Sequence, residues 1–338
     1  MIPFSFKKTL FFILIALIFV NCKSKNNTKD NTTNTPSNQI TVLTEKISKD
    51  VNNATLYNSR AKLYLAENKV NDALGDISKA LQIDEKNVDY FITLSDIYLA
   101  MNLINKSQDA LTKALSLSPQ NVETYLKLAE LNLFLKKYDE THKNADKAIA
   151  ILALTPKAFF IKGFAYKETG DSSKAVTSFL KTIEIEPEYY DAYMQLGLMF
   201  SNRKNKLAVD YFNSALNLKP KSIEAYYALG MFQQENGNPD AAIKAYKNII
   251  AIDPKYKQAY FNVGYVYLEY KHVYNEAIKS FTDAITVDKK YAEAYYNRGY
   301  TYELMKETDK AKSDYKMAMQ IRTNYPKAIE GLNRLDKK

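Results

Sequence analysis

The sequence is poor in the residues that build disulfides, metal sites and many catalytic centres. Its 338 residues include one cysteine, two histidines and no tryptophan. A single cysteine cannot form an intramolecular disulfide or supply a cysteine-based metal site. The two histidines, His142 and His272, lie far apart and have no carboxylate or cysteine at ligand spacing. Because a glycine-rich phosphate loop, an HExxH motif and a nucleophile elbow are also missing, we expect no catalysis, no cofactor and no metal.

One long apolar run stands near the N-terminus. Thr9–Val20 holds twelve residues that are almost wholly apolar, and Lys7 and Lys8 precede it. This length suits the hydrophobic region of a signal peptide and falls short of the roughly 20 residues that a membrane span needs. Cys22 follows the run and precedes a polar tract. The segment therefore predicts export of the chain.

The place of Cys22 resembles the processing site of bacterial lipoproteins. In that family the cysteine is acylated and becomes the mature N-terminus, so the resemblance implies a signal peptide over residues 1–21 and a lipid on Cys22. Phe19 and Asn21 depart from that family's usual aliphatic and small residues. An uncleaved anchor, ordinary secretion and a soluble cytoplasmic protein therefore stay open as alternatives.

Residues 22–40 begin with this cysteine and continue with a tract dominated by asparagine and threonine. The tract has too little apolar surface to offset the entropy of ordering, so we expect a disordered tether. It also lacks the acidic cluster that promotes surface export of lipoproteins in some bacterial groups. We therefore expect a protein of the bacterial cell envelope that faces the periplasm, at the outer membrane rather than the inner one.

The formal net charge of the chain is +9. Part of this charge belongs to the N-terminal segment and the tether, and both signs are mixed along the remaining sequence. Because no dense stripe of lysine and arginine is present, the pattern is typical of a solvated surface. We expect no nucleic-acid partner.

A repeat of 33 to 35 residues occurs eight times in succession. The copies begin at Ala54, Val88, Val122, Pro156, Tyr190, Ile223, Lys257 and Ala292. The fourth position of every copy is aromatic, and the eighth is small. The small residues are Ala61, Ser95, Ala129, Gly163, Gly197, Gly230, Gly264 and Gly299. A unit of this length cannot bury its apolar face alone, so neighbouring copies must stack.

Further small and apolar residues recur within each copy at spacings of three, four and seven, which indicate one face of a helix. Each copy therefore predicts two helices, A and B, joined by a short turn of the kind that holds Gly170 and Gly237. Helix B carries a small residue and, four residues later, an apolar or aromatic one in most copies. We expect the small residue of helix A to let helix B approach closely.

Over residues 54–325 this order of aromatic and small residues resembles the tetratricopeptide repeat family, with Tyr or Phe in place of its common Trp. The resemblance implies an all-α fold, a right-handed α-solenoid of about eight helix-turn-helix repeats. Repeat five lacks one residue between Ser201 and Leu207, and repeat seven has one extra between Glu269 and Glu276. We expect both length changes to fall in interhelix turns, where loop length is tolerated.

Both ends of the repeat array carry a sequence that can cover it. Residues 326–338 predict a capping helix with an apolar face formed by Ala328, Ile329, Leu332 and Leu335. Residues 41–53 predict an N-terminal helix, whose apolar face includes Ile47 and Val51.

In tetratricopeptide proteins the A helices line a concave groove, so the resemblance implies a partner site at repeat positions five and nine. No copy has the Lys and Asn pair that clamps a C-terminal carboxylate in the best-known peptide-binding members. Repeats one to three offer a mixed lining that Asp96 and Glu130 make locally acidic. Repeats four to eight offer an apolar and aromatic strip: Phe160, Phe164, Met194, Leu198, Tyr227, Met231, Phe261, Tyr265, Tyr296 and Tyr300.

Two kinds of partner suit this strip. A protein segment gripped by it would make the chain a non-catalytic, lipid-anchored scaffold that binds other envelope proteins. Such a chain resembles in architecture the tetratricopeptide lipoproteins that support pilus biogenesis, outer-membrane protein assembly or control of cell-wall hydrolases. The alternative is a glycan or peptidoglycan fragment, because aromatic side chains suit sugar faces. Packing within the groove without any partner is a further reading, and the oligomeric state stays open.

Overall fold

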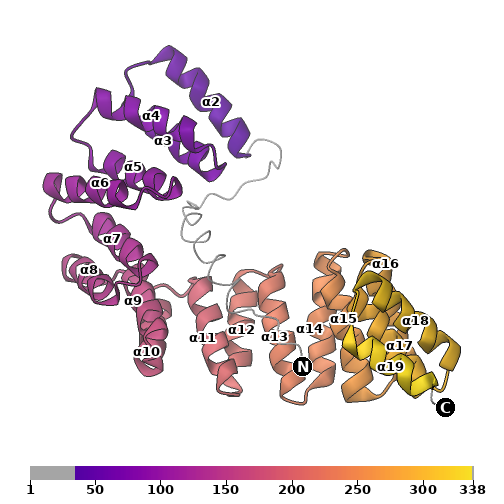
Figure 1. The fold of residues 1–338 in the computed structure, drawn as a ribbon. Helices are drawn as coiled ribbons and strands as arrows, with labels where there is room; N and C mark the ends of the chain where they lie inside the picture. The colour runs from indigo at the N-terminus through magenta and orange to yellow at the C-terminus, as the bar shows by residue number, and fades with distance from the viewer. Residues whose placement is uncertain (1–34, 337–338) are drawn as a thin grey trace. The chain divides into compact units, whose positions relative to one another are not determined.

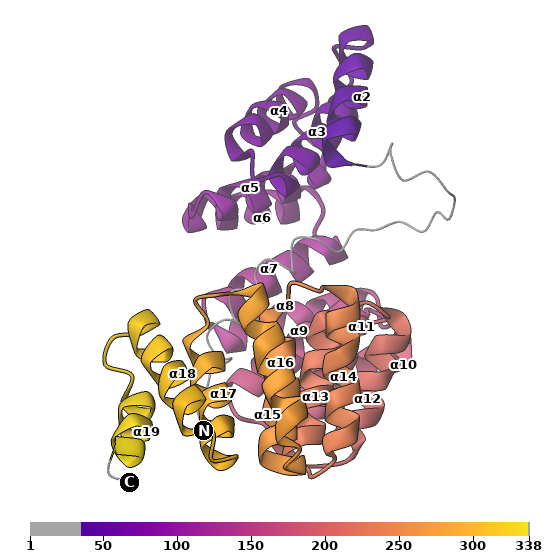
Figure 2. The ribbon, with the colours of Figure 1, turned by 90° about the vertical axis from the view of Figure 1, so that its right-hand side faces the viewer.

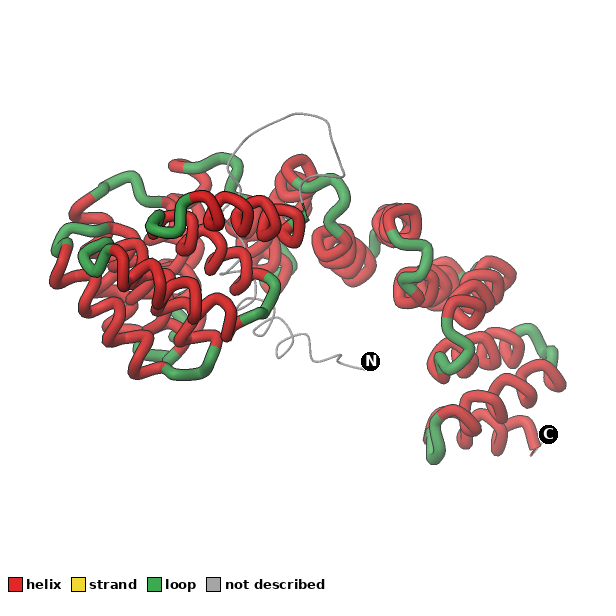
Figure 3. Tube along the Cα trace, turned by 90° about the horizontal axis from the view of Figure 1, so that it is seen from above, coloured by secondary structure: helices red, strands yellow, loops and turns green. Residues whose placement is uncertain are grey.

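The computed structural model describes residues 35–336, and in that part of the chain every regular element is a helix (Figure 1, Figure 3). The chain forms two compact units, one ending at Ser178 and the other beginning at Phe179. The predicted signal peptide, Cys22 and the first part of the predicted tether lie outside the described residues. Within the described part, no helix is both long and apolar enough to cross a bilayer.

The first unit, called unit 1, holds an N-terminal helix and the first three and a half repeats. Its helices are α2 (Pro36–Lys49), α3 (Ala54–Ala66), α4 (Val70–Ile83), α5 (Val88–Ala100), α6 (Ile104–Leu117), α7 (Val122–Phe134), α8 (Tyr138–Ile151) and α9 (Pro156–Glu168). Helix α10 (Ser172–Ile185) contains the boundary between the units.

The second unit, called unit 2, holds repeats five to eight and a final helix (Figure 2). Its helices are α11 (Tyr190–Asn202), α12 (Leu207–Leu218), α13 (Ile223–Glu235), α14 (Pro239–Ile252), α15 (Lys257–Val266), α16 (Tyr274–Val287), α17 (Ala292–Leu304), α18 (Thr308–Ile321) and α19 (Pro326–Asp336). A five-residue π-helix, η1 (Tyr267–Lys271), continues α15. Each of the eight A helices in the two units begins at the residue where its sequence copy begins.

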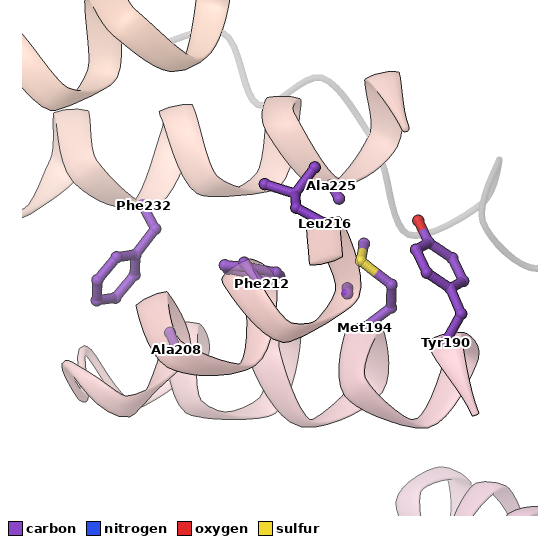
Figure 4. Close-up of a cluster of buried hydrophobic side chains, with 8 residues drawn as sticks. Tyr190, Met194, Ala208, Phe212, Leu216, Ala225 and Phe232 are labelled. Carbon is purple, nitrogen blue, oxygen red and sulfur yellow. The ribbon is translucent and has the colours of Figure 1, made fainter. Parts of the chain in front are cut away.

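In unit 2, helices A and B of one repeat pack through one small and one large side chain. In unit 2 the small residue is glycine, and a Cβ added to Gly197 would lie 2.5 Å from the ring of Phe212. A Cβ added to Gly230 would lie 2.6 Å from the ring of Tyr246. Figure 4 shows Phe212 of α12 in the buried cluster of this repeat. The close approach of the two helices therefore requires glycine at these positions, as the sequence predicted.

The turn from helix A to helix B contains one residue with positive φ in every repeat. These residues are Asn68, Asn102, Lys136, Gly170, Lys204, Gly237, His272 and Lys306. Glycine adopts this left-handed conformation without strain, whereas lysine and histidine do not. A left-handed residue therefore recurs in every turn, although glycine occupies only two of these positions.

The two length changes in the repeats are absorbed near the start of helix B or the end of helix A. In repeat five, α12 begins at Leu207 and is 12 residues long, whereas the B helices of the other repeats are 14 residues long. In repeat seven, the extra residue is taken up by the π-helix at the end of α15. The expectation that this residue lies in the turn was wrong, because the last helical turn widens instead.

Both ends of the array are covered by a single helix. At the C-terminus, Gly331 of α19 lies against the ring of Tyr315, with 2.5 Å from an added Cβ to that ring. At the N-terminus, Arg60 of α3 donates to Thr44 of α2 at 2.9 Å, as Arg298 of α17 donates to Thr282 of α16 at 3.0 Å. Helix α2 thus occupies the place of a preceding helix B.

The N-terminal helix differs in its limits from the predicted residues 41–53. It begins at Pro36, because Thr35 caps it and proline suits the first helical position, and it ends at Lys49. Ile40 and Ile47 are buried, whereas Val51 lies beyond the helix and is 56% exposed. An open pocket of about 360 Å³ lies between α2 and α3, lined by Gln39, Val42, Leu43, Ser59 and Leu63.

Candidate functional site

The ten residues of the predicted apolar strip are divided between the two units. Phe160 and Phe164 lie on α9 of unit 1. The other eight lie on the four A helices of unit 2, two on each: Met194, Leu198, Tyr227, Met231, Phe261, Tyr265, Tyr296 and Tyr300. The two sets are therefore described as separate surfaces.

In unit 2 the residues at repeat position five pack against the aromatic residue of helix B in the same repeat. The ring centroids of Tyr227 and Tyr246 are 6.3 Å apart, and those of Phe261 and Phe281 are 5.6 Å apart. Met194, at the same position of repeat five, is 2% exposed. Position five therefore contributes mainly to the core of each repeat.

The residues at repeat position nine of unit 2 are partly buried, and each retains some exposed surface. The ring of Tyr265 stacks on Phe261 with centroids 6.4 Å apart and planes 21° apart. Tyr300 stacks on Tyr296 at 6.4 Å with planes 4° apart. Leu198 and Met231 at the same position are also partly buried. One row of apolar side chains thus lies on top of a second row that anchors it.

The pair on α9 has a different environment. Phe164 is 5% exposed and lies edge-on to Phe160, with ring centroids 4.9 Å apart. The Lys167 ammonium lies 5.4 Å from the centroid of Phe164. Phe164 therefore offers almost no contact area in this conformation, although the sequence favoured it as an anchor for a partner.

Tyrosines that directly precede an A helix or the final helix α19 pack beneath these aromatic residues, and they were not predicted from the sequence. Tyr291 lies 5.4 Å from Phe261, and Tyr325 lies 5.5 Å from Tyr296, between ring centroids. Each tyrosine therefore fixes the position-five ring of the preceding repeat. The signal was present in the sequence, because Tyr256, Tyr291 and Tyr325 recur at the repeat spacing.

In unit 1 the A helices carry a network of charges where the sequence predicted an acidic lining. The Lys127 ammonium lies 2.9 Å from a carboxylate oxygen of Asp96 and 3.7 Å from one of Glu130. Lys157 contacts Glu130 at 3.0 Å and Glu123 at 3.5 Å. The two lysines largely neutralise the acidic residues, so this lining is polar but not strongly acidic.

Burial controls the titration of this network. Burial raises the pKa of Asp96 above its ordinary value, although Lys127 works in the opposite direction. Burial also acts to lower the pKa of Lys127, but the attraction of Asp96 and Glu130 outweighs it and raises that pKa. Lys127 therefore stays charged at neutral pH and holds the carboxylates of two successive repeats together.

Two carboxylates on the A helices of unit 2 lack such a partner. Burial raises the pKa of Asp191, and burial together with the charge of Asp191 raises the pKa of Glu224. Among the residues that the structure describes, neither carboxylate forms an ion pair. The Lys219 ammonium lies instead over the ring of Tyr190, 3.8 Å from its centroid. This end of unit 2 therefore keeps unsatisfied negative charge.

The described residues contain no group of three or more His, Cys, Asp or Glu side chains that could hold a metal ion. His142 lies against Tyr166 with ring centroids 4.2 Å apart, and His272 forms part of an interhelix turn. The expectation of a chain without catalysis or cofactor stays a prediction.

Family models for the tetratricopeptide repeat match five stretches of the chain, two of which overlap. The model described as "Tetratricopeptide repeat" matches residues 88–121, 156–189 and 223–256, and a second model with that description matches residues 292–325. The model described as "TPR repeat" matches residues 273–306. Models of this family thus match stretches of both units.

A solved structure with this fold is the C-terminal part of a TPR repeat-containing protein from Cytophaga hutchinsonii. It has a TM-score of 0.63 and 19% identity, and the match covers 71% of this chain and 99% of that one. At this identity the likeness concerns the fold alone. It agrees with the all-α solenoid predicted from the sequence.

The curated relatives match short stretches of the chain. Tetratricopeptide repeat protein 6 of Homo sapiens is 28% identical over 139 residues, which are 40% of this chain and 26% of that protein. A UDP-N-acetylglucosamine–peptide N-acetylglucosaminyltransferase of Giardia intestinalis is 29% identical over 89 residues, 26% of this chain and 6% of the enzyme. The chain spans about a quarter or less of these relatives, so neither match transfers an activity.

Proposed function

We propose that this chain is a non-catalytic, lipid-anchored scaffold of the bacterial cell envelope that grips a segment of a partner protein on the A helices of unit 2. The tetratricopeptide fold supports a role in protein–protein interaction. The lipid anchor rests on the sequence around Cys22, which lies outside the described residues.

The observation that carries the binding role is the partly exposed row at repeat position nine. In unit 2 it consists of Leu198, Met231, Tyr265 and Tyr300, each on a separate A helix and each only partly buried. The position-five rings of Phe261 and Tyr296 stack on Tyr265 and Tyr300 and hold them in place. A preorganised row of large apolar side chains binds a partner with little loss of side-chain entropy.

The binding role is tested by crosslinking in cells followed by recovery of the chain and its partners. We expect the Tyr265→Ala/Tyr300→Ala variant to lose its crosslinked proteins while its far-ultraviolet circular dichroism stays unchanged. The matched control is Phe134→Ala, which removes an exposed aromatic side chain from unit 1. This control should keep its crosslinked proteins. Equal partner recovery from the double variant and the control contradicts the proposal.

The anchor is tested separately, through Cys22. Cells grown with a labelled fatty acid should label the wild-type chain and leave Cys22→Ser unlabelled, and the variant should leave the membrane fraction. A wild-type chain that is unlabelled, full length and soluble contradicts the anchor. The binding role is not affected by that result.

Glycan binding, the alternative, predicts a different outcome. A panel of wall glycans would retain the purified chain, and Tyr265→Ala/Tyr300→Ala would abolish this retention. Since sugar sites add directional polar groups to stacking rings, and Leu198 and Met231 supply none, the protein segment is the better-supported partner.

A further inference from the structure

The extra residue of repeat seven changes the end of helix α15. In six other repeats, an N–H at the start of helix B donates to the carbonyl five residues earlier, as Glu307 donates to Tyr302 at 2.9 Å. In repeat seven the corresponding bond runs from Val273 to Tyr267, six residues earlier, at 3.0 Å. The inserted residue is thus held inside a hydrogen-bonded π-turn, η1, rather than in a loop.

This π-turn brings two tyrosines together. Residues five apart on an α-helix point about 140° away from each other, so their side chains do not meet. Tyr265 and Tyr270 are five apart, yet their ring centroids are 6.4 Å apart with planes at 63°. Because a π-turn places residues five apart on one face, the pair is a direct consequence of the insertion.

The pair lies at the surface and close to the carboxylate of Glu269. Tyr270 is 41% exposed and belongs to η1. Burial raises the pKa of Tyr265, and the charge of Glu269 adds to this rise. Within residues 35–336, Glu269 forms no ion pair.

Many other aromatic rings of this chain already have a cation over them. Lys310 lies 5.3 Å from the centroid of Tyr302, and Lys174 lies 5.4 Å from that of Tyr166. In the described part of the chain, no lysine or arginine lies over Tyr265 or Tyr270. The nearby Lys271 is bound by Asp240. The pair therefore combines exposed ring surface, unsatisfied negative charge and no internal cation.

From this juxtaposition we propose that Tyr265 and Tyr270, with Glu269 as the counter-charge, receive one lysine or arginine side chain of the partner segment. Two tyrosine rings at an angle present their electron-rich faces to a cation, and the carboxylate of Glu269 attracts its charge. The apolar neighbours of that cation then contact Met231 and Tyr300 on either side. The partner segment is accordingly one basic residue flanked by large apolar residues.

This inference rests on the proposed function, and it specifies one chemical property of the partner segment, a basic residue. The net charge of the chain is +9, so a basic peptide gains no general attraction to it. Binding of such a peptide must come from a local acidic site.

The test is selection from a random peptide library on the full chain, immobilised in detergent. We expect the selected peptides to share one lysine or arginine flanked by apolar residues. Replacement of that basic residue by glutamine should weaken binding about tenfold. The Glu269→Gln/Tyr270→Leu variant should bind the original peptide more weakly by a similar factor. Its affinity for the peptide with glutamine should equal that of the wild-type chain.

Matched variants separate the site from general effects. Tyr270→Phe keeps the ring and should keep the affinity within about twofold. Glu276→Gln removes an exposed carboxylate from helix B of the same repeat and should have no effect. Raising the salt concentration should weaken peptide binding to the wild-type chain more than peptide binding to Glu269→Gln/Tyr270→Leu.

Three results overturn the inference. The first is a set of selected peptides without a basic residue, and the second is a basic residue whose contribution does not depend on Glu269 and Tyr270. In both cases the proposed function stands if binding still requires Tyr265 and Tyr300. The third is a library that yields no binding peptide. In that case the crosslinking experiment alone tests the proposed function.

Discussion

Units 1 and 2 are built from the same repeat but hold their helices together with different side chains. Unit 1 pairs Ala61 with Ile77, and Ala129 with Ala145, inside its repeats. Unit 2 pairs a glycine with an aromatic ring, as in Gly197 with Phe212. One repeat framework therefore accepts two packing solutions, provided that the size of one partner matches the other.

The starts of the A helices differ in the same way. In unit 1, Asn53, Asn87 and Asn121 precede an A helix and accept hydrogen bonds from its first N–H groups. In unit 2, Tyr256 and Tyr291 stand at this place without a side-chain cap. Their rings pack on the previous repeat instead. At these two helices unit 2 thus exchanges a local hydrogen bond for contact between repeats, whereas Ser222 caps α13 as the asparagines cap the helices of unit 1.

The largest effect is expected from a substitution that breaks the charge network of unit 1. Lys127→Met leaves Asp96 and Glu130 without their shared cation, so we expect a loss of about 3 kcal/mol in the free energy of unfolding at pH 7. Burial already raises the pKa of Asp96. The folded variant therefore holds protons more tightly than the unfolded chain, and the loss should shrink as the pH falls.

Urea denaturation between pH 7 and pH 4 measures this loss. Lys127→Met/Asp96→Leu/Glu130→Leu, which replaces the network by apolar side chains, should regain most of the stability. A deficit that is the same at both pH values would show that the lysine acts through packing alone.

The next effect concerns the glycines of unit 2. Gly197→Ala forces the Phe212 ring to move, because the new Cβ would lie 2.5 Å from it, and should cost about 2–3 kcal/mol. Gly75→Ala on α4 meets nothing within 4 Å and should instead stabilise the chain by about 0.5–1 kcal/mol. Gly197→Ala/Phe212→Leu copies the packing of unit 1 and should recover part of the loss. If Gly197→Ala and Gly75→Ala changed the free energy of unfolding alike, the close glycine–ring packing proposed for unit 2 would be contradicted.

A smaller effect separates the two ways of starting an A helix. Tyr291→Ala removes a ring that contacts Phe261 and should cost about 2 kcal/mol. Asn121→Ala removes a cap and should cost about 1 kcal/mol. Tyr291→Asn tests the exchange directly, since the new side chain restores the cap without the ring. Chemical denaturation of the three variants should rank Tyr291→Asn between the other two.

The smallest effect concerns the unpaired carboxylate of unit 2. Burial raises the pKa of Glu224, so the folded chain binds its proton more tightly than the unfolded chain, and ionisation destabilises the fold. Glu224→Gln should therefore raise Tm by about 1–2 °C at pH 7. The gain should vanish below about pH 4, where the wild-type carboxyl is protonated in both states.

The helices of this molecule could be predicted from the sequence because one pattern is repeated eight times. The start of every A helix and the close contact at Gly197 follow from the spacing of small and large residues. The network around Lys127 was missed, since its partners lie in different repeats and meet only after stacking. The π-turn was missed because an insertion shows its place in the sequence only approximately.

The binding strip was predicted as one set, and the structure separates its members by depth. Met194 and Phe164 fit the pattern, yet they are buried, because a repeat position does not state how deep its side chain lies. Tyr270 lies beside Tyr265 and was not in the set, since it meets that ring only through the widened helical turn. The sequence therefore did not predict how deeply each side chain is buried or where the helix geometry changes.

The glycine within each A helix of unit 2 has a consequence for the order in which the chain opens. Glycine lowers helix propensity by about 1 kcal/mol relative to alanine, so such a helix is weak by itself. It is held by the aromatic ring of its helix B, and that ring fills a space that exists only while both helices are in place. Helices A and B of unit 2 should consequently open as pairs. In amide hydrogen exchange, the two helices of one repeat would then show equal protection.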